Sequence, residues 1–269
     1  MRQSRTAAGT ASLLLAAACA FADPATAQVA SPDPAVAYAA LGDSYSSGAG
    51  AGDYLPPDKG CKRSSHAYPV LWAEAHAPSS FSFLACNGAG TTDILHDQLG
   101  TLGPRTGLVT LTAGGADAGF SGAMTTCALG GATRCLSAVS GARTTMDGPL
   151  RDNLDRLYSA IRDKAPAAHV VVLGYPHLYR LRGSCALGLA DSERAAVNGA
   201  VDHLNEVIAR RAAAHGFTFA DVTAAFEGHE ICSASPWLHS VDVLAITESY
   251  HPNAPGQSLG YLPVLTRAS

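Results

Sequence analysis

The sequence predicts an α/β fold with a five-stranded parallel sheet covered by helices on both faces. Three observations carry this prediction: five short apolar runs are spread along the chain, loops or helical patterns separate them, and two of those patterns are amphipathic stripes. Short apolar runs are typical of buried strands. Strands that alternate with helices form parallel sheets, because each connection has to cross from one end of the sheet to the other.

The predicted elements follow one another in a regular order. The strands are expected at residues 36–41, 81–85, 108–112, 169–173 and 217–222. Between the third and fourth strands, a helix that begins at Pro149 carries an apolar stripe of Leu150, Leu154, Leu157 and Ile161. Between the fourth and fifth, a helix that begins at Asp191 or Ser192 and ends before Gly216 carries a stripe of Val197, Val201, Leu204 and Ile208. We interpret both stripes as core-packing faces.

Residues 1–27 have the pattern of a secretory signal peptide. Arg2 and Arg5 precede an apolar stretch, and a small-x-small tripeptide ends at Ala27. The apolar stretch is about a dozen residues long, too short for the ~30 Å hydrocarbon core of a bilayer, so no stable membrane insertion is expected. We therefore expect a secreted, extracellular protein with a single domain over residues 28–269.

The expected mature domain is mildly acidic. The chain has 18 basic and 22 acidic residues, of which two and one lie in residues 1–27, so the domain has a net charge of −5 with neutral histidines. No basic stripe remains that could follow a phosphate backbone, which argues against nucleic-acid binding. The chain shows no internal repeat or linker, and its length suits one α/β domain, which we expect to be monomeric.

Six cysteines in an exported domain predict disulfide bridges, because the extracellular compartment is oxidising. They are Cys61, Cys86, Cys127, Cys135, Cys185 and Cys232, and their spacing alone does not select a pairing. There is no C-x-x-C or H-E-x-x-H pattern, which argues against a metal site, and no cofactor is expected. A seventh cysteine, Cys19, would carry the lipid of a lipoprotein, but Ala16 stands where such a signal prefers leucine.

A candidate nucleophile follows the first predicted strand. Ligands of parallel sheets bind beyond the carboxyl ends of the strands, which is where Ser44 in the tripeptide Gly-Asp-Ser lies. Taken alone, this tripeptide is better explained as a turn. A serine hydroxyl needs a base to take its proton, and histidine is the usual base near neutral pH. His251, in a loop before the expected final helix, could meet Ser44 at the edge of the sheet.

Four segments together resemble the ordered blocks of the SGNH (GDSL) hydrolases. They are GDSYSSG at 42–48, ACNGAG at 85–90, TAGGADAGF at 112–120 and SYHPNAPGQ at 249–257. The likeness is greatest to the secreted actinobacterial lipases, esterases and phospholipases, and it covers residues 38–257. It implies a three-layer α/β/α sandwich of flavodoxin-like type and a single SGNH hydrolase domain that acts in lipid metabolism.

The resemblance also implies residue roles. Ser44 would be the nucleophile and His251 the general base, while the backbone N–H groups of Ser44 and Gly88 would form an oxyanion hole. Asp43 is expected to hold the nucleophile turn and to take no part in proton transfer. The implied disulfides are Cys61–Cys86, Cys127–Cys135 and Cys185–Cys232.

One position of the third block departs from the family pattern. That block usually reads Gly-x-Asn-Asp, and the asparagine side chain is the third oxyanion donor, but this chain has Ala116 there. A methyl group donates no hydrogen bond, and loss of one such donor costs on the order of 10² to 10³ in turnover. Asn87 is the nearest possible substitute in the sequence, and its alternative role is to hold its own turn.

A second departure concerns the group that orients His251. Many family members have an aspartate three residues before the histidine, where this chain has Glu248. In the secreted actinobacterial branch a backbone carbonyl often serves instead, which here is the carbonyl of Ser249. We favour the carbonyl, and either group would select the same histidine tautomer.

These features predict a secreted serine hydrolase that cleaves carboxylic esters through a Ser44 acyl-enzyme. The substrate would be a small-molecule or lipid ester with a short to medium acyl chain, and residues 121–148, rich in Gly, Ala, Ser and Thr, would form a mobile border to the acyl site. One alternative is an acyltransferase or thioesterase that acts on a natural product. Another is a catalytically degenerate lipid- or glycan-binding protein, which Ala116 would explain.

Overall fold

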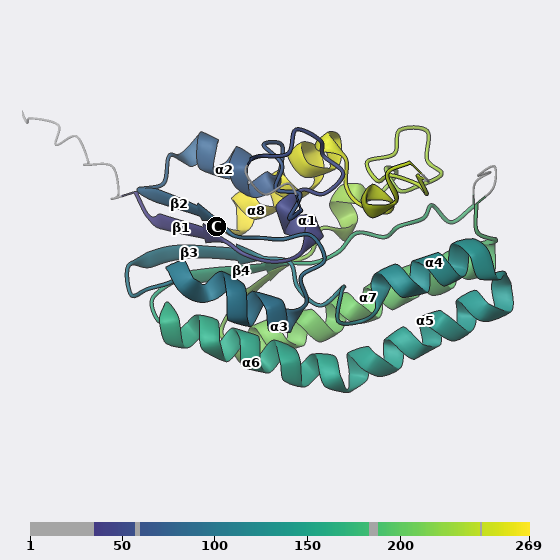
Figure 1. Ribbon diagram of the computed structural model, residues 1–269, viewed down its shortest axis with the longest axis horizontal. Helices are drawn as coiled ribbons and strands as arrows, with labels where there is room; N and C mark the ends of the chain where they lie inside the picture. The colour runs from purple at the N-terminus through teal and green to yellow at the C-terminus, as the bar shows by residue number, and fades with distance from the viewer. Residues whose placement is uncertain (1–34, 57–59, 183–187, 243) are drawn as a thin grey trace, which may run out of the picture. The chain divides into compact units, whose positions relative to one another are not determined.

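A five-stranded parallel sheet forms the centre of the structure, with the strand order β2-β1-β3-β4-β5 (Figure 1). The structure is a computed structural model, and it describes residues 35–56, 60–182, 188–242 and 244–269. The strands are β1 (Ala37–Ala40), β2 (Ser80–Phe83), β3 (Thr106–Leu111), β4 (His169–Leu173) and β5 (Thr218–Ala220). All five overlap the runs predicted from the sequence, so the predicted parallel α/β sheet is confirmed.

The strand order places one switch point in the sheet, between β1 and β3. The chain moves from β1 to β2 on one side and then returns to β3 on the other side of β1. The loops that follow β1 and β3 therefore diverge at their carboxyl ends and leave a crevice there, as in other sheets of this order. Ser44 follows β1 and Ala116 follows β3, so the topology brings the first and third sequence blocks to the same crevice.

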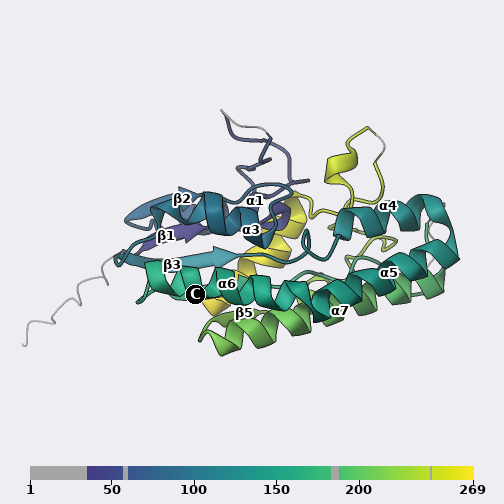
Figure 2. The ribbon, with the colours of Figure 1, turned by 60° about the horizontal axis from the view of Figure 1, so that its bottom comes forward.

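Helices cover both faces of the sheet (Figures 1 and 2). One layer contains α2 (Tyr68–His76) and α8 (Leu262–Ala268), and the other contains α3 (Thr91–Asp93), α6 (Pro149–Lys164) and α7 (Asp191–Ala214). The remaining elements are α1 (Ser44–Ser47), α4 (Phe120–Gly130), α5 (Ala132–Asp147), η1 (Ile94–Gln98), η2 (Leu99–Thr101), η3 (Thr223–Phe226), η4 (Ile246–Glu248) and η5 (Gly256–Tyr261).

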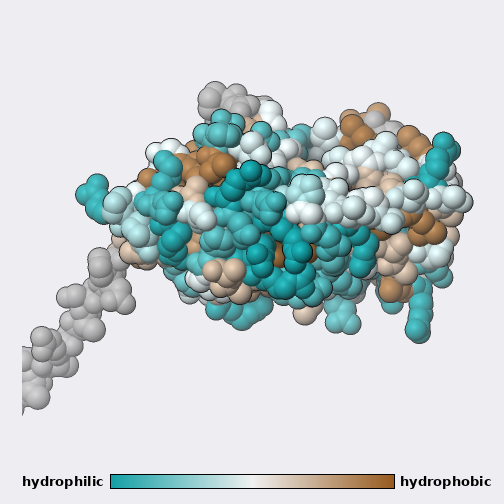
Figure 3. Space-filling view, turned by 90° about the horizontal axis from the view of Figure 1, so that it is seen from below, coloured by the Kyte–Doolittle hydropathy of each residue, from teal (hydrophilic) through white to brown (hydrophobic). Residues whose placement is uncertain are grey.

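The two helices predicted from apolar stripes are confirmed. Helix α6 begins at Pro149, and its four stripe residues are fully buried. Its opposite face is polar in Figure 3 and carries the exposed residues Arg151, Asp152, Arg156, Asp163 and Lys164. Helix α7 ends before Gly216, whose φ of +67° suits a glycine just beyond a helix end.

The segment 121–148, which the sequence predicted only as a border to the acyl site, lies in two helices, α4 and α5, joined at Gly131. Their buried residues recur at helical spacing and pack toward α7: Met124, Cys127, Cys135, Val139 and Met146. Small Ala, Ser, Thr and Gly residues surround this stripe and weaken its apolar contrast, so the sequence analysis predicted no helix here. The Cys127–Cys135 disulfide ties the two helices together next to their turn.

Two sequence predictions concern residues outside the described part of the chain. The signal peptide at residues 1–27 is one, and Cys185 of the third expected disulfide is the other. Neither prediction is tested by the structure. Among the described helices, none is both long and apolar enough to cross a membrane.

Candidate active site

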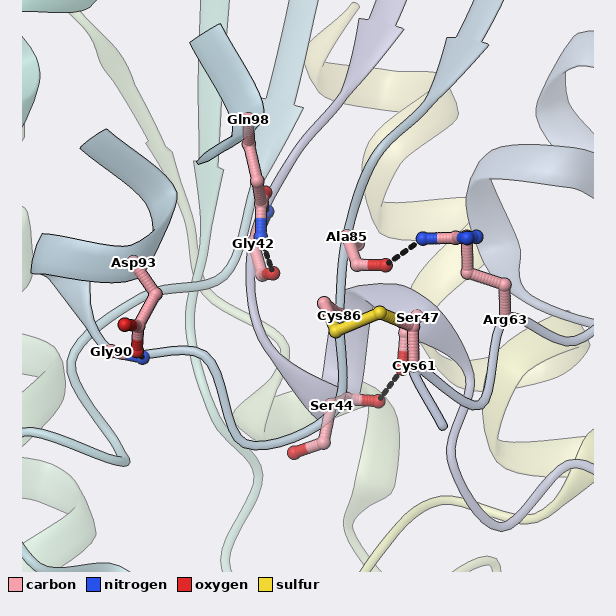
Figure 4. Close-up of a disulfide and its surroundings, with 10 residues drawn as sticks. All are labelled: Gly42, Ser44, Ser47, Cys61, Arg63, Ala85, Cys86, Gly90, Asp93 and Gln98. Carbon is pink, nitrogen blue, oxygen red and sulfur yellow. Dashed lines mark hydrogen bonds between the residues drawn. A yellow bond between two sulfur atoms is a disulfide. The ribbon is translucent and has the colours of Figure 1, made fainter. Parts of the chain in front are cut away.

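The first candidate segment is the turn that links β1 to α1 and carries Ser44. Gly42 in this turn has a φ of +120°, and a Cβ atom there would lie 2.5 Å from the carbonyl oxygen of Thr112, so only glycine fits. The side-chain amide of Gln98 makes hydrogen bonds with both the N–H and the carbonyl of Gly42 (Figure 4). Its Oε1 accepts from the Gly42 N–H at 2.7 Å, and its Nε2 donates to the Gly42 carbonyl at 2.9 Å. The turn is thereby fixed at the switch point of the sheet.

Asp43 is buried and caps the N-terminus of α1. Its Oδ1 accepts hydrogen bonds from the Tyr45 N–H at 3.0 Å and the Thr112 hydroxyl at 2.6 Å, and its Oδ2 accepts from the Tyr175 hydroxyl at 2.5 Å. Burial raises the pKa of Asp43 to about 6, and these three hydrogen bonds oppose the rise. The carboxylate thus ties the turn to the ends of β3 and β4, in agreement with the holding role expected for it.

Ser44 and His251 meet although 207 residues separate them. The Ser44 Oγ lies 2.7 Å from His251 Nε2, and His251 Nδ1 lies 3.0 Å from the Ser249 carbonyl oxygen. A carbonyl can only accept, so the proton is on Nδ1 and the Nε2 lone pair faces the serine hydroxyl. Burial lowers the pKa of His251 to about 4, while the hydrogen bond to Ser249 opposes the change. The imidazole is therefore neutral at pH 7 and can accept a proton.

Glu248 contacts Lys62. Its Oε1 accepts a hydrogen bond from Lys62 Nζ at 2.8 Å in an ion pair. Burial on its own would raise the pKa of Glu248, but the hydrogen bonds from Lys62 and Tyr54 outweigh it and lower that pKa. The group at the Nδ1 side of His251 is therefore the Ser249 carbonyl, the option favoured from the sequence.

Ser44 and Gly88, whose backbone N–H groups are the candidate oxyanion donors, line the same cavity. Gly88 is exposed with a φ of +83°, and Ser44 is the first residue of α1. Within the part of the chain that the structure describes, neither of these N–H groups donates a hydrogen bond to the protein. Both residues line one cavity, so both donors are available to an oxygen that develops negative charge there.

Ala116 also lines this cavity and is exposed. The backbone beside it is held firmly, because the Gly115 N–H donates to the Tyr175 hydroxyl at 3.1 Å and Tyr175 in turn donates to Asp43. The Ala116 carbonyl accepts from the Gly119 N–H at 3.0 Å. Position 116 therefore lies in a fixed place beside the candidate oxyanion hole, with no side-chain donor.

Asn87 also lines the cavity, next to Gly88 in the sequence. Its backbone N–H donates to the Cys61 carbonyl at 2.9 Å. Its half-buried side-chain amide lines the cavity and makes no hydrogen bond with any described residue. The possible substitute donor therefore lies at the site, and no described residue uses its side-chain amide as a hydrogen-bond partner.

The cavity has a volume of about 310 Å³ and a mostly apolar wall. Its apolar lining residues include Phe120, Met124, Leu178, Val201, Leu204 and Ile246. Ser121, Met124 and Thr125 of α4 also line it, so the segment 121–148 borders this cavity. A second, wholly apolar cavity of about 40 Å³ lies between the α4–α5 pair and α7 and shares several of these residues. Together the two cavities lead from Ser44 into the helical layer.

Two of the three disulfides implied by the resemblance are present: Cys61–Cys86 and Cys127–Cys135. The first is drawn in Figure 4, where it lies near Ser44 and Ser47 of α1. Among the described residues, no group of three His, Cys, Asp or Glu side chains could hold a metal ion.

Sequence reasoning missed two contributors to the site, Tyr175 and Lys62. Tyr175 lies two residues after the end of β4, so its place at the carboxyl edge of the sheet could have marked it. Lys62 lies in a long loop without periodicity, and nothing in its sequence context indicates that its partner is 186 residues away.

The chain is similar to known proteins over most of its length. A sequence model of the GDSL-like lipase/acylhydrolase family matches residues 40–259. The chain is 56% identical to Lipase 1 of Streptomyces coelicolor over the full length of both proteins. The crystal structure of an extracellular lipase from Streptomyces rimosus aligns with 87% of this chain and 100% of its own, at 54% identity and a TM-score of 0.85. Phospholipase A1 from Streptomyces albidoflavus aligns with the same shares, at 54% identity and a TM-score of 0.86.

Proposed function

The chain belongs to the GDSL-like lipase/acylhydrolase family, and from this premise we propose that Ser44 attacks the carbonyl carbon of a lipid ester, with His251 as its base. One observation carries the proposal. Ser44 Oγ, the His251 imidazole and the Ser249 carbonyl form a continuous hydrogen-bonded line at 2.7 and 3.0 Å inside an apolar cavity. This is the arrangement that nucleophilic catalysis by serine requires.

In the first half of the reaction, the proton of the Ser44 hydroxyl passes to His251 Nε2 as Oγ forms a bond to the ester carbon. The carbonyl oxygen becomes an oxyanion and accepts hydrogen bonds from the N–H groups of Ser44 and Gly88. The imidazolium is stabilised by the hydrogen bond from Nδ1 to the Ser249 carbonyl. When the bond to the leaving oxygen breaks, His251 gives its proton to the departing alcohol, and an acyl-enzyme remains.

In the second half, water attacks the acyl-enzyme. His251 takes one proton from the water, the new oxyanion is held by the same two donors, and the Ser44–acyl bond breaks. The proton returns to Ser44 Oγ, and the carboxylic acid leaves. In both halves of the reaction, the charges that form are the positive charge of the imidazolium and the negative charge of the oxyanion.

The cavity supports an ester with a short to medium acyl chain as the substrate. A mostly apolar wall favours a hydrocarbon chain, and Ser44 and His251 line the same cavity. The similarity to proteins named lipase and phospholipase A1 supports glycerolipid esters as the class.

We further propose that the protein acts outside the cell as a monomer and does not bind nucleic acid. The signal-like residues 1–27 would be removed, leaving one domain over residues 28–269. Two disulfides in the described part of the chain suit an oxidising compartment, and a similar Streptomyces rimosus lipase is described as extracellular. The third disulfide, Cys185–Cys232, belongs to the same proposal.

A second candidate function is binding of a lipid or glycan without catalysis, which Ala116 favours. The decisive experiment compares wild type and Ser44→Ala on p-nitrophenyl esters of graded chain length and on a phospholipid. We expect the wild type to cleave them and to be labelled at Ser44 by an organophosphorus ester, and Ser44→Ala to do neither. A wild type without cleavage or labelling would leave binding as the function. An added alcohol that captures the acyl group in place of water would instead indicate an acyltransferase.

A further inference from the structure

Four consecutive residues, Cys61, Lys62, Arg63 and Ser64, contact three segments of the candidate active site: the nucleophile turn with α1, the loop that carries Gly88, and the loop that carries His251. We call these residues the strap. Cys61 is bonded to Cys86 and accepts the Asn87 N–H at 2.9 Å, next to Gly88.

The strap also reaches the nucleophile segment. The Ser64 N–H donates to the Ser47 carbonyl of α1 at 2.8 Å, and the Ser47 hydroxyl donates to the Ser44 carbonyl at 3.1 Å. Figure 4 shows the disulfide, the link between Ser47 and Ser44, and the Arg63 side chain at the Ala85 carbonyl within one small region. The strap is thus fastened to both the nucleophile turn and the loop that carries Gly88.

Lys62 fastens the strap to the third segment, residues 246–251, which we call the histidine loop. Its Nζ lies 2.8 Å from Glu248 Oε1 and 4.9 Å from the centre of the Tyr54 ring. The side chains of Lys62 and Glu248 are only 18% and 22% exposed, so water and salt screen this ion pair less than a pair on the open surface.

Glu248 lies directly beside the backbone that orients the catalytic imidazole. Its carbonyl accepts the His251 N–H at 3.2 Å, and the next residue, Ser249, supplies the carbonyl that receives the Nδ1 proton. The other end of the histidine loop has its own anchor, the Tyr45 hydroxyl, which donates to the Tyr250 carbonyl at 2.8 Å. A shift of Glu248 would therefore move the acceptor that sets the direction of the ring.

We propose that Lys62 is a positioning residue: through Glu248 it holds the Ser249 carbonyl, and hence the His251 ring, in register with Ser44 and Gly88. This inference rests on the proposed hydrolase function. The strap makes one rigid frame of three segments that come from distant parts of the chain. Glu248, which stands where many family members have the triad acid, then has a structural role: its carboxylate binds Lys62 and so connects the histidine loop to the strap.

The test compares five proteins: wild type, Lys62→Met, Glu248→Met, the charge swap Lys62→Glu with Glu248→Lys, and a control. Methionine keeps the apolar stem of lysine beside Tyr54 and removes the charge. The control is Arg211→Met, which removes a half-exposed ion pair to Asp155 between α7 and α6, at 3.2 Å and away from the cavity. For each protein, kcat and KM on a soluble ester, the rate of labelling by a small organophosphorus ester, and the melting temperature are measured.

We expect Lys62→Met and Glu248→Met each to lose about tenfold in kcat and in labelling rate, since a misplacement of 1 Å in a catalytic group can cost on the order of 10²-fold. KM should change by less than about twofold, because substrate binding is untouched. The charge swap should recover most of the loss. Arg211→Met should match Lys62→Met in melting temperature and keep its kcat.

Three results would overturn the positioning role of Lys62 and leave the proposed hydrolase function standing. They are an active wild type with unchanged kcat in both methionine variants, a loss that appears in KM only, and a charge swap that folds and recovers no kcat. A wild type that is neither active nor labelled would overturn the proposed function as well.

Discussion

Ala116→Asn should raise kcat, because position 116 is where the site lacks a donor. Ala116 is exposed and lines the same cavity as Ser44 and Gly88, so an asparagine amide has room to reach the oxyanion. The backbone there is held through Gly115 and Tyr175, which fixes the direction of the new side chain. A third donor would complete the oxyanion hole.

The size of the gain depends on two opposing terms. One oxyanion donor stabilises the transition state by about 2.7 to 4 kcal/mol. Ordering an exposed asparagine side chain costs roughly 0.5 to 1.5 kcal/mol. The balance of about 1.2 to 3.5 kcal/mol corresponds to roughly a tenfold to few-hundredfold rise in kcat. KM should change little, because the hydrogen bond forms only as the oxygen becomes charged.

The assay is steady-state hydrolysis of the best p-nitrophenyl ester by wild type, Ala116→Asn, Ala116→Leu and Ala116→Asp. Leucine matches asparagine in size and has no donor, so it should gain nothing, and aspartate should lose activity because its charge repels the oxyanion. Since the side chain is exposed, the melting temperature should stay close to that of wild type. If Ala116→Asn folds and gains nothing while Asn87→Ala loses about a hundredfold, Asn87 is the third donor. If neither change matters and wild type is already fast, the reasoning that the site lacks a donor is wrong.

Four further predictions can be checked with the same protein. His251→Ala and Ser44→Ala should each abolish nearly all hydrolysis, and the double variant should lose little more, because the two groups act as one unit; multiplicative losses in kcat would contradict this. Glu248→Gln keeps the acceptor for Lys62 and should lose less than about tenfold in kcat, whereas a triad acid changed to its amide loses ~10⁴. Because burial lowers the pKa of His251 to about 4, and only the neutral imidazole accepts the serine proton, kcat/KM should be flat from neutral pH to about pH 5 and fall below it; a fall centred near pH 6.5 would show that the ring is solvated. Replacing Cys127 and Cys135 by serine should lower the free energy of unfolding by roughly 2 to 4 kcal/mol and leave kcat unchanged, while the same change at Cys61 and Cys86 should lower kcat as well, as denaturant titration and kinetics would show.

The sequence by itself determined the sheet, helices α6 and α7, and the identity of the candidate dyad. Strands and long amphipathic helices have a local apolar pattern, because burial acts on residues that are close along the chain. Ser44 and His251 could be named since each lies in a short block with a chemical signature. The departure at Ala116 was visible for the same reason.

Only the tertiary structure decided how the site is held together. The Tyr175–Asp43 hydrogen bond joins residues 132 positions apart, and the Lys62–Glu248 ion pair joins residues 186 apart. Such contacts depend on which loops the topology brings to one edge of the sheet. The α4–α5 pair was missed because its stripe is buried against α7 amid small residues that give little local contrast. Local patterns report what a segment buries, whereas the partner of a single charge is set by the packing of the whole chain.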